Sequence, residues 1–455
     1  MSRDRRIDVV RPPAFVYRRE GRGALRALFC EQADLAWLAA RFGTPLYVYS
    51  AQTIRARLLA FGKAFRSIPH TVCYSVKANS TLAILRLIAR DGAGFDVVSG
   101  GELERVLRAA PQSAARVVFS GVGKTVPEIE LALQSGILLF NVESASELTA
   151  LGAAAARLNK KAAIALRVNP DVSAKTHPYI STGLREHKFG VPIAEARKLY
   201  AEATRHAHLR VAGVSVHIGS QITDLTSFTD ALRRVAELVR ELRSSGQDIR
   251  YVDAGGGLGI PYREDAEPFT KQLAAYAKAV MEPLRGLDIH LLLEPGRSIV
   301  GPAGVLVTRV IYRKTNHEKR FLIVDAAMND LLRPSLYGAY HEIVPVQLGL
   351  PSSISSSSFS PSSSSTDARS RETEKVDVVG PICETGDFFA RDRELPIVRE
   401  GDLLAILDAG AYGASLSSNY NTRGRASEVL VDGTNARLIR KRETPEDQMK
   451  LEVRS

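Results

Sequence analysis

The stretch CYSVKAN, residues 73–79, joins an apolar, strand-like run to a turn that carries a single lysine. Apolar residues then recur at helical spacing from Leu82 to Ile88, which predicts a helix directly after the turn. Lys77 is therefore expected at the functional edge of a parallel α/β protein. Partial desolvation there would lower the pKa of the lysine and free its amine for imine chemistry. Taken alone, such a stretch more often holds an ordinary ion-paired lysine.

The same alternation of strand and helix continues from residue 46 to residue 300. A first strand covers residues 45–49, and eight more strand candidates follow, ending near Lys77, Asp96, Ser120, Glu143, Arg167, His217, Asp253 and Glu294. Helical patterns follow most of these strands. Eight such units in about 250 residues predict an α/β fold of the (β/α)8 barrel type, with a doubly wound sheet as the alternative. In a barrel, all of these strand ends meet at one rim.

The rest of the chain predicts a second, β-rich domain. Strand patterns fill residues 301–440, and the N-terminal segment, residues 1–45, is expected to contribute strands to the same domain. Residues 351–375 form a serine-rich insert that cannot bury apolar area, so we expect it to be disordered. The charged residues 441–455 are expected to form a mobile tail.

Composition narrows the class of protein. The chain has 455 residues, 45% of them hydrophobic, which is ample for two domains. Its three cysteines, Cys30, Cys73 and Cys383, show no disulfide or metal-ligand spacing, and with no signal peptide this indicates a cytoplasmic protein. No apolar run is long enough to span a membrane. The net charge is +11, but scattered arginines favour a small anionic ligand over nucleic acid.

Two glycine-containing turns on the expected rim could bind a phosphate group. Gly255, Gly256 and Gly257 follow one strand, and Glu294, Pro295, Gly296 and Arg297 follow the last one. Glycines let backbone N–H groups approach an anion closely, although each cluster could equally be a tight turn. A phosphate site beside a lysine points to pyridoxal 5'-phosphate as cofactor and to no metal.

Other residues could complete such a site. Glu294 is placed to pair with the pyridine nitrogen, and His217 could stack on the ring or be an ordinary core histidine. Cys383 could return a proton to a carbanion, but a cysteine is more often an apolar filler. Tyr412 lies between glycines in a second turn-rich stretch.

At this point the residues resemble a known family, the diaminopimelate decarboxylases. The resemblance rests on long strings in the family's order between about residues 40 and 432, which are YSVKAN (74–79), GAGFDVVSGGEL (92–103), FSGVGKT (119–125), FNVES (140–144), LRVNPDV (166–172), THPYISTGL (176–184), KFG (188–190), HIGSQ (217–221), GGGLGI (255–260), EPGR (294–297), VDAAMNDLLRPSLY (324–337), GPICETGD (380–387) and GAYG (410–413). The serine-rich insert departs from the family's pattern, but it falls between these strings.

The resemblance implies removal of carbon dioxide from the D-centre of meso-2,6-diaminopimelate to give L-lysine, the last step of lysine biosynthesis. It also implies a homodimer with shared active sites. Lys77 would hold the cofactor as an internal aldimine, and Cys383 of the partner subunit would donate a proton. The other implied cofactor contacts are His217, Ser220, Gly255, Gly256, Gly257, Glu294, Pro295, Gly296, Arg297 and Tyr412. The implied substrate contacts are Arg297, Arg333, Tyr337, Glu384 and Tyr412.

Alternatives remain at this point. A related decarboxylase of another basic amino acid, or of carboxynorspermidine, would use the same cofactor residues. Diaminopimelate carries both a carboxylate and an amine at its far end, and arginine suits the carboxylate while an acid suits the amine. Arg297, Arg333 and Glu384 could supply both, which argues against ornithine, lysine or arginine as substrate. A non-catalytic relative would not need Lys77, Glu294 and Cys383 together.

Overall fold

The computed structural model describes residues 9–11, 14–19, 26–172, 188–222, 224–262, 268–348 and 372–453. The chain divides into two compact units. The barrel unit contains residues 54–261 and 265–299, and the β-rich unit contains residues 1–53, 262–264 and 300–455.

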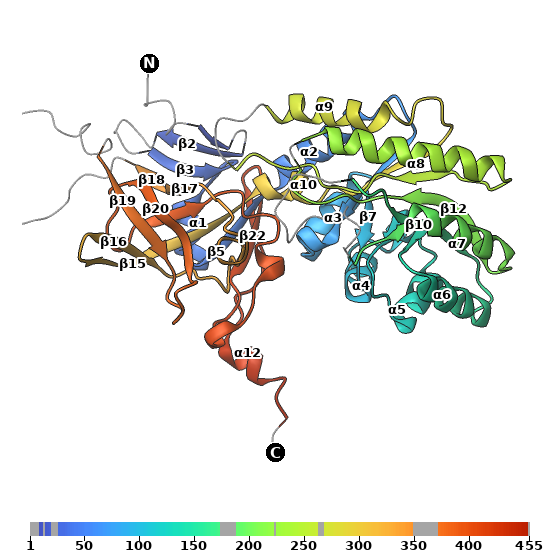
Figure 1. Cartoon of the computed structure of the whole chain (residues 1–455). Coiled ribbons are helices and arrows are strands. Elements are labelled where there is room, and N and C mark those ends of the chain that lie inside the picture. The colour runs from blue at the N-terminus through green and yellow to red at the C-terminus, as the bar shows by residue number, and fades with distance from the viewer. Residues whose placement is uncertain are drawn as a thin grey trace, which may run out of the picture. The chain divides into compact units, whose positions relative to one another are not determined.

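The barrel unit (Figure 1) contains a sheet with a ring of eight parallel strands, and a short ninth strand, β11 (Val191–Pro192), pairs with β10 outside the ring. The strands of the ring are β6 (His70–Ser75), β7 (Gly94–Val97), β8 (Val117–Phe119), β9 (Leu139–Val142), β10 (Ala162–Asn169), β12 (Leu209–Ser215), β13 (Tyr251–Asp253) and β14 (His290–Leu293). The last strand pairs back onto the first, with Leu291 opposite His70 and Leu293 opposite Val72. The sheet is therefore closed, which confirms the predicted (β/α)8 barrel and rules out the doubly wound alternative.

Helices surround the closed sheet (Figure 1). They are α2 (Ala51–Ala64), α3 (Leu82–Arg90), α4 (Gly100–Ala109), α5 (Val126–Ser135), α6 (Ala145–Arg157), α7 (Ile193–Arg205), α8 (Thr226–Ser244), α9 (Phe269–Met281) and the short α10 (Arg297–Val300). On α8 the buried side chains recur at helical spacing, for example at Leu232, Val235 and Val239. Thr125 and Glu128 form a capping box at the start of α5. These local signals explain which face of α8 is buried and where α5 begins.

The β-rich unit contains a nine-stranded sheet and a smaller one. The larger sheet is built from β5 (Leu46–Ser50), β15 (Gly304–Asn316), β16 (Lys319–Val324), β17 (Ile343–Pro345), β19 (Thr373–Val379), β20 (Phe388–Pro396), β21 (Leu403–Ile406), β22 (Ser427–Asp432) and β23 (Asn435–Arg440). The smaller sheet is built from β1 (Val9–Arg11), β2 (Phe15–Arg19), β3 (Arg26–Cys30), β4 (Ala33–Asp34) and β18 (Gln347–Leu348). Helices α1 (Leu35–Phe42), α11 (Arg333–Tyr337) and α12 (Pro445–Met449) belong to the same unit.

The structure corrects the expected boundary between the two units. Residues 46–50, expected to open the barrel, form β5, which pairs with β15 and β22 in the β-rich sheet. Every residue of β5 is buried, so its sequence has the continuous apolar character of a barrel strand. Composition alone therefore could not assign it to the right sheet.

Two expectations about irregular segments also need comment. Residues 349–371, which include most of the serine-rich insert, lie outside the described residues, whereas residues 373–375 already belong to β19. The expected mobile tail, residues 441–455, contains the helix α12, with a capping box made by Thr444 and Asp447. The high charge of this tail favoured the prediction of a mobile segment, whereas the sequence Thr-Pro-Glu-Asp is typical of the start of a helix.

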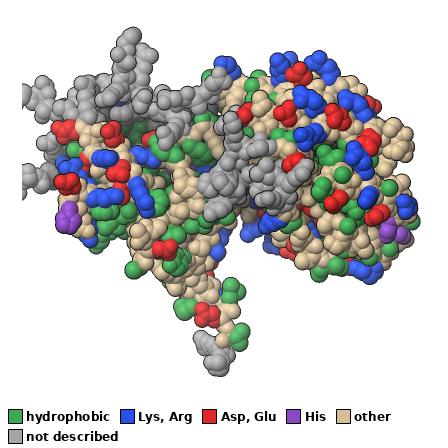
Figure 2. Space-filling model, in the orientation of Figure 1, with side chains coloured by type: hydrophobic (Ala, Val, Ile, Leu, Met, Phe, Trp, Pro, Cys, Tyr) green, Lys and Arg blue, Asp and Glu red, His purple; other side chains and the backbone are tan. Residues whose placement is uncertain are grey.

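The surface carries both signs of charge. On the face shown in Figure 2, lysine and arginine side chains are interspersed with acidic ones over the coloured surface. Within the part of the chain that the structure describes, no helix has both the length and the apolar character needed to cross a membrane.

A buried ion pair ties the rim of the barrel together. The Lys124 side chain is fully buried, and its Nζ atom donates to Glu147 Oε1 at 2.7 Å and to the carbonyl oxygens of Gly121 and Asn141, both at 2.8 Å. Glu147 Oε2 in turn accepts the N–H of Glu143. These bonds join the loops after β8 and β9 to the start of α6. Burial raises the pKa of the Glu147 carboxyl, and the adjacent Lys124 opposes that rise.

Replacing Lys124 by methionine should destabilise the barrel unit. The change would leave the Glu147 carboxylate buried without its cation, which typically costs about 3–5 kcal/mol of unfolding free energy. Urea unfolding would measure the loss, and the double variant Lys124→Met, Glu147→Gln should recover part of it. Arg233→Met, which removes an exposed ion pair with Asp230 on α8, is the matched control and should cost under about 1 kcal/mol. Equal losses in the two methionine variants would contradict the assignment.

Candidate active site

Lys77 lies at the carboxyl end of β6, in a short 3-10 turn of residues 76–78. Its Nζ atom is 2.8 Å from Asp96 Oδ2, and Asp96, on β7, is fully buried. The Lys77 side chain itself is 36% exposed, so it is partly buried, in line with the partial desolvation expected from the sequence. The structure gives an accessible amine held by one buried carboxylate. This arrangement leaves Lys77 able to react with a bound molecule while Asp96 fixes its direction.

The turn after β14 packs directly against the turn that carries Lys77. Ser75 N–H donates to the Pro295 carbonyl at 3.2 Å, and Ser75 Oγ lies 2.9 Å from the Glu294 carbonyl oxygen. A Cβ atom at Gly296 would stand only 3.0 Å from the side chains of Ser75 and Ala78. Glycine at residue 296 therefore allows the two turns to meet. The lysine and the glutamate of the rim come together because β6 and β14 are paired neighbours.

The glycines after β13 fit a crowded place between β12 and β14. A Cβ at Gly256 would collide with the Glu294 carbonyl oxygen, and Gly257 has a φ of +105°. Gly256 N–H donates to His217 Nδ1 at 3.1 Å. Tight packing alone is enough to require glycine at these positions. The same packing brings the backbone of this glycine loop close to the rim of the barrel. Ser220 lies nearby, and its Oγ accepts from Arg297 Nη2 at 3.3 Å.

Two buried carboxyl groups stand side by side at the ends of β13 and β14. Asp253 and Glu294 are 0% and 5% exposed. Burial raises the pKa of both carboxyls, and the negative charge of Asp253 raises that of Glu294 well above its ordinary value. Glu294 Oε1 accepts from Ser120 Oγ at 3.1 Å. A proton on one of the two carboxyls, or a cation beside them, would therefore stabilise the pair at this end of the barrel.

His217, after β12, is a neutral imidazole. Burial lowers its pKa well below the ordinary value, and the positive charges of Arg167 and Lys77 lower it further. Its Nδ1 atom accepts the Gly256 N–H, so any ring proton lies on Nε2. A neutral flat ring suits packing against another ring. Arg167 is itself held by Glu143, with 2.9 Å between Nη1 and Oε1.

This set of residues fits pyridoxal 5'-phosphate. The cofactor needs a lysine for its aldehyde, an acid for its pyridine nitrogen, a flat neighbour for its ring and a phosphate site. Lys77, Glu294 and His217 could supply the first three, and the surplus negative charge of the Asp253–Glu294 pair would match a protonated ring nitrogen. The glycine loop and Arg297 could supply N–H groups and a cation for a phosphate.

In the β-rich unit, Arg333 is held by two rings. Its Nη1 atom lies 2.8 Å from His341 Nε2, and its guanidinium lies 4.8 Å from the centroid of the Tyr262 ring. His341 Nδ1 lies 2.8 Å from the Leu407 carbonyl oxygen, which fixes the proton on Nδ1. Arg333 is therefore oriented as a buried cation, a state suited to binding a carboxylate.

The other predicted residues of this unit lie on turns. Cys383 and Glu384 are exposed in a loop that Asp387 holds, since its carboxylate accepts the N–H groups of Met328 and Ile382, both at 2.7 Å. Glu384 bonds to the Tyr420 hydroxyl. Tyr337 and Tyr412 are half-buried. All four residues, Cys383, Glu384, Tyr337 and Tyr412, belong to the β-rich unit.

Sequence reasoning gave no role to several residues that the structure places around the site. Asp96, Ser120 and Asp253 are strand ends, so their positions were predicted while their partners were not. Asn141, on β9, and His341 carried no signal at all in the sequence. The predicted string 176–184 lies outside the described residues.

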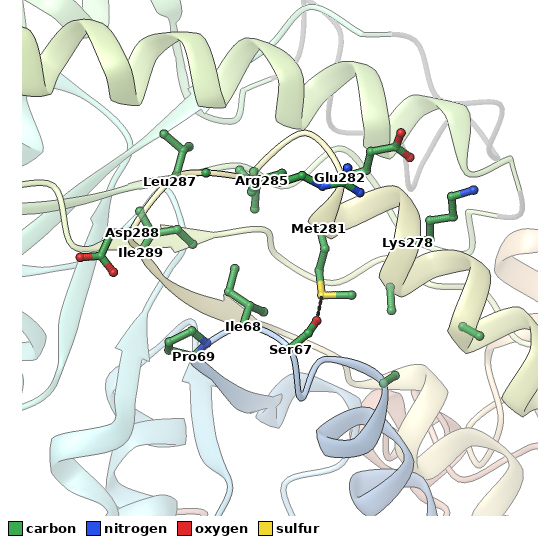
Figure 3. Close-up of a pocket in the computed structure, with 15 residues that line it drawn as sticks. Ser67, Ile68, Pro69, Lys278, Met281, Glu282, Arg285, Leu287, Asp288 and Ile289 are labelled. Carbon is green, nitrogen blue, oxygen red and sulfur yellow. Dashed lines mark hydrogen bonds between the residues drawn. The ribbon is translucent and has the colours of Figure 1, made fainter.

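A separate cavity lies at the other end of the barrel. It measures about 570 Å³ and is lined by the residues before β6 and β14 and by the end of α9, among them Ser67, Met281 and Asp288 (Figure 3). Because Lys77 and Glu294 lie at the carboxyl ends of these strands, this cavity is not the site. In the ranges that the structure describes, no group of three or more histidine, cysteine or acidic residues is placed to hold a metal.

Comparison with known proteins agrees with this geometry. Residues 51–301 match the family model described as pyridoxal-dependent decarboxylase, pyridoxal binding domain. The diaminopimelate decarboxylase of Pseudomonas aeruginosa is 52% identical over 420 residues, covering 92% of this chain and 95% of that protein. Two solved structures, both described as diaminopimelate decarboxylase with L-lysine, are similar. The one from Helicobacter pylori has a TM-score of 0.83 at 43% identity and covers 91% of this chain and 98% of its own. The one from M. jannaschii has a TM-score of 0.86 at 38% identity, and the match covers 97% of this chain and 98% of that one. The chain therefore belongs to the diaminopimelate decarboxylase family of pyridoxal-dependent decarboxylases.

Proposed function

We propose that this chain removes carbon dioxide from the D-centre of meso-2,6-diaminopimelate and releases L-lysine. The observation that carries the proposal is the shared rim of Lys77 and the buried Glu294, in a chain 52% identical to a diaminopimelate decarboxylase. Pyridoxal 5'-phosphate supplies an aldehyde that condenses with amines and a ring that accepts electrons.

Lys77 is the amine that holds the cofactor's aldehyde. Asp96 Oδ2, 2.8 Å from Lys77 Nζ, accepts a hydrogen bond from the amine and directs it. The partial exposure of Lys77 supports this role, because a substrate amine must later reach the same position. Asp96 remains buried and keeps its place through Ser75 Oγ at 2.8 Å.

The neighbouring residues bind and orient the cofactor. Glu294 pairs with the pyridine nitrogen, and His217 packs on the ring. Phosphate and ring edges are held by Ser220, Gly255, Gly256, Gly257, Pro295, Gly296, Arg297 and, from the β-rich unit, Tyr412. The buried acid pair, the neutral imidazole and the closely packed glycine loop support these assignments.

Substrate recognition is assigned to residues that match both groups at the far end of diaminopimelate. Arg333 and Arg297 bind carboxylates, Glu384 binds the distal amine, and Tyr337 and Tyr412 complete the contacts. The orientation of Arg333 by His341 and Tyr262 supports its role, because a fixed guanidinium binds a carboxylate through two parallel hydrogen bonds.

Protonation of the carbon that loses carbon dioxide is assigned to Cys383 of the partner subunit in a homodimer. The exposure of Cys383 on an ordered loop supports this part of the proposal, because the thiol is accessible to a second chain. We also place the protein in the cytoplasm. Three free cysteines, all within described residues, support that location, since free thiols persist in a reducing compartment.

A direct assay with Lys77 variants tests the activity. Purified protein incubated with meso-2,6-diaminopimelate and pyridoxal phosphate should release carbon dioxide and L-lysine. Lys77→Ala and Lys77→Arg should both lose turnover and the visible absorbance of the lysine-bound cofactor, although arginine keeps a cation beside Asp96. Lys63→Ala, an exposed change on α2, should keep both. A Lys77→Ala protein that retains the absorbance band and normal turnover would remove Lys77 from the mechanism.

Substitution of Arg333 tests the substrate. Arg333→Ala should raise KM for diaminopimelate roughly 10- to 100-fold, because a hydrogen bond to a charged group contributes about 1.5–3 kcal/mol. Steady-state kinetics measure the change, and thermal unfolding checks the fold. The exposed Arg320, on β16, provides the control variant Arg320→Ala, which should leave KM unaltered. Wild-type activity on ornithine with none on diaminopimelate would overturn the substrate assignment.

Mixed dimers test the sharing of active sites. Lys77→Ala and Cys383→Ala subunits, each inactive alone, should recover about a quarter of wild-type activity when they are co-expressed. Random pairing makes half of the dimers mixed, and each of these holds one intact site of two. Size-exclusion chromatography would confirm the dimers. No recovery in verified mixed dimers would place Cys383 in the site of its own subunit.

A further inference from the structure

Four polar side chains, one of them Glu294, meet inside the barrel. They are Ser120, Asn141, Asp253 and Glu294, from the ends of β8, β9, β13 and β14, and none is more than 5% exposed. The proposed function gives a task to Glu294 alone. Polar groups buried this deeply need partners, so the contacts among the other three carry information about what they do.

Asn141 links the group together. Its amide nitrogen donates to Asp253 Oδ2 at 2.6 Å and to Ser120 Oγ at 3.0 Å, which uses both of its hydrogens. Ser120, having accepted this bond, donates its own hydrogen to Glu294 Oε1 at 3.1 Å. The orientation of the amide follows from charge, because the reverse orientation would set the amide oxygen against the Asp253 carboxylate.

The two carboxyl groups receive unequal support. Asp253 accepts two N–H groups, from Asn141 and, at 2.9 Å, from the backbone of Gly255. Glu294 accepts one hydroxyl from Ser120, and a further hydrogen bond joins the two carboxyl groups to each other. Hydrogen bonds to a carboxylate favour its charged form, so the charge of the pair lies on Asp253 and the shared proton lies on Glu294, which donates it to Asp253. Burial raises the pKa of both carboxyls, so the pair holds a proton between them.

Other titratable groups around the pair do not reverse this order. Asp96 adds negative charge and raises the pKa of Glu294, whereas Lys77 lowers it. Cys73, on β6, and Tyr276, on α9, also face the pair, and burial raises the pKa of both, so each stays neutral. The unequal hydrogen bonding of the two acids is therefore the feature that decides where the proton lies.

We propose that Asn141 is a positioning residue that keeps Asp253 charged and so sets the basicity of Glu294 toward the ring nitrogen of the cofactor. The inference rests on the proposed function, in which Glu294 pairs with that nitrogen. Glu294 would give the proton on its carboxyl oxygen to the lone pair of that nitrogen. Glu294 would then be a carboxylate beside a cationic ring, with the net charge unchanged. The Asp253 charge then keeps Glu294 basic and the ring nitrogen protonated.

Nitrogen NMR of the holoenzyme, loaded with pyridoxal phosphate labelled at the ring nitrogen, tests the inference. Asn141→Leu removes the donor from Asp253, so the ring nitrogen should lose its proton about one to two pH units lower than in the wild type. Ser120→Ala removes the donor from Glu294 and should shift the same titration upward. A merely structural effect would not move the two variants in opposite directions. An unaltered titration in Asn141→Leu, or shifts of the same sign in both variants, would overturn the inference.

Two further variants keep the result decisive. Glu294→Gln should deprotonate the ring nitrogen in any case, and if it does not, the proposed pairing of Glu294 fails rather than the role of Asn141. Asp253→Asn should lower the titration as Asn141→Leu does, and it replaces that variant if Asn141→Leu does not fold. A titration that Asp253→Asn leaves unaltered would overturn the inference as well. Retention of the visible absorbance in each variant shows that Lys77 still holds the cofactor.

Discussion

The pairing of β14 with β6 is the constraint on which the site depends. The two strands pair in parallel register, from Leu291 opposite His70 to Leu293 opposite Val72. Without it the sheet would remain open, and the first and last strands would lie at opposite edges. Closure brings the turn after residue 75 against the turn after residue 293, which puts Lys77 and Glu294 on one rim. The proximity of Lys77 and Glu294 therefore follows from the strand pairing that closes the barrel.

Closure also has an electrostatic consequence. The interior of a closed barrel excludes water, so each acid at a strand end must find a cation, a proton or donors. Asp96 is paired with Lys77 and Glu143 with Arg167, and Glu147, at the start of α6, is paired with Lys124. Asp253 and Glu294 instead bond to neutral donors and to each other. This remaining negative charge is what makes a ring with a positive nitrogen a natural occupant.

The sequence predicted the barrel well because its signals were local. Apolar strands and periodic helices are recognised from neighbouring residues, and each of the eight predicted strand ends lies within a few residues of the observed one. The assignment of β5 failed because a strand buried on both faces looks the same in either sheet. The helix α12 was missed because charge outweighed its capping residues. Pairings such as Asn141 with Asp253 or Arg333 with His341 join distant parts of the chain, and no local pattern encodes them.

Partial exposure of Lys77 suits an amine that must react. The sequence suggested a partly desolvated amine at a strand end, and the 36% exposure of its side chain agrees, because an amine with no solvent access could not exchange one partner for another. The structure places full burial on Asp96, which is enclosed and bonded to Ser75. A fixed carboxylate orients the accessible amine without needing to move. The orientation of the amine at residue 77 is thus a property of two adjacent strands, and a lysine placed after β6 without an acid on β7 would lack it.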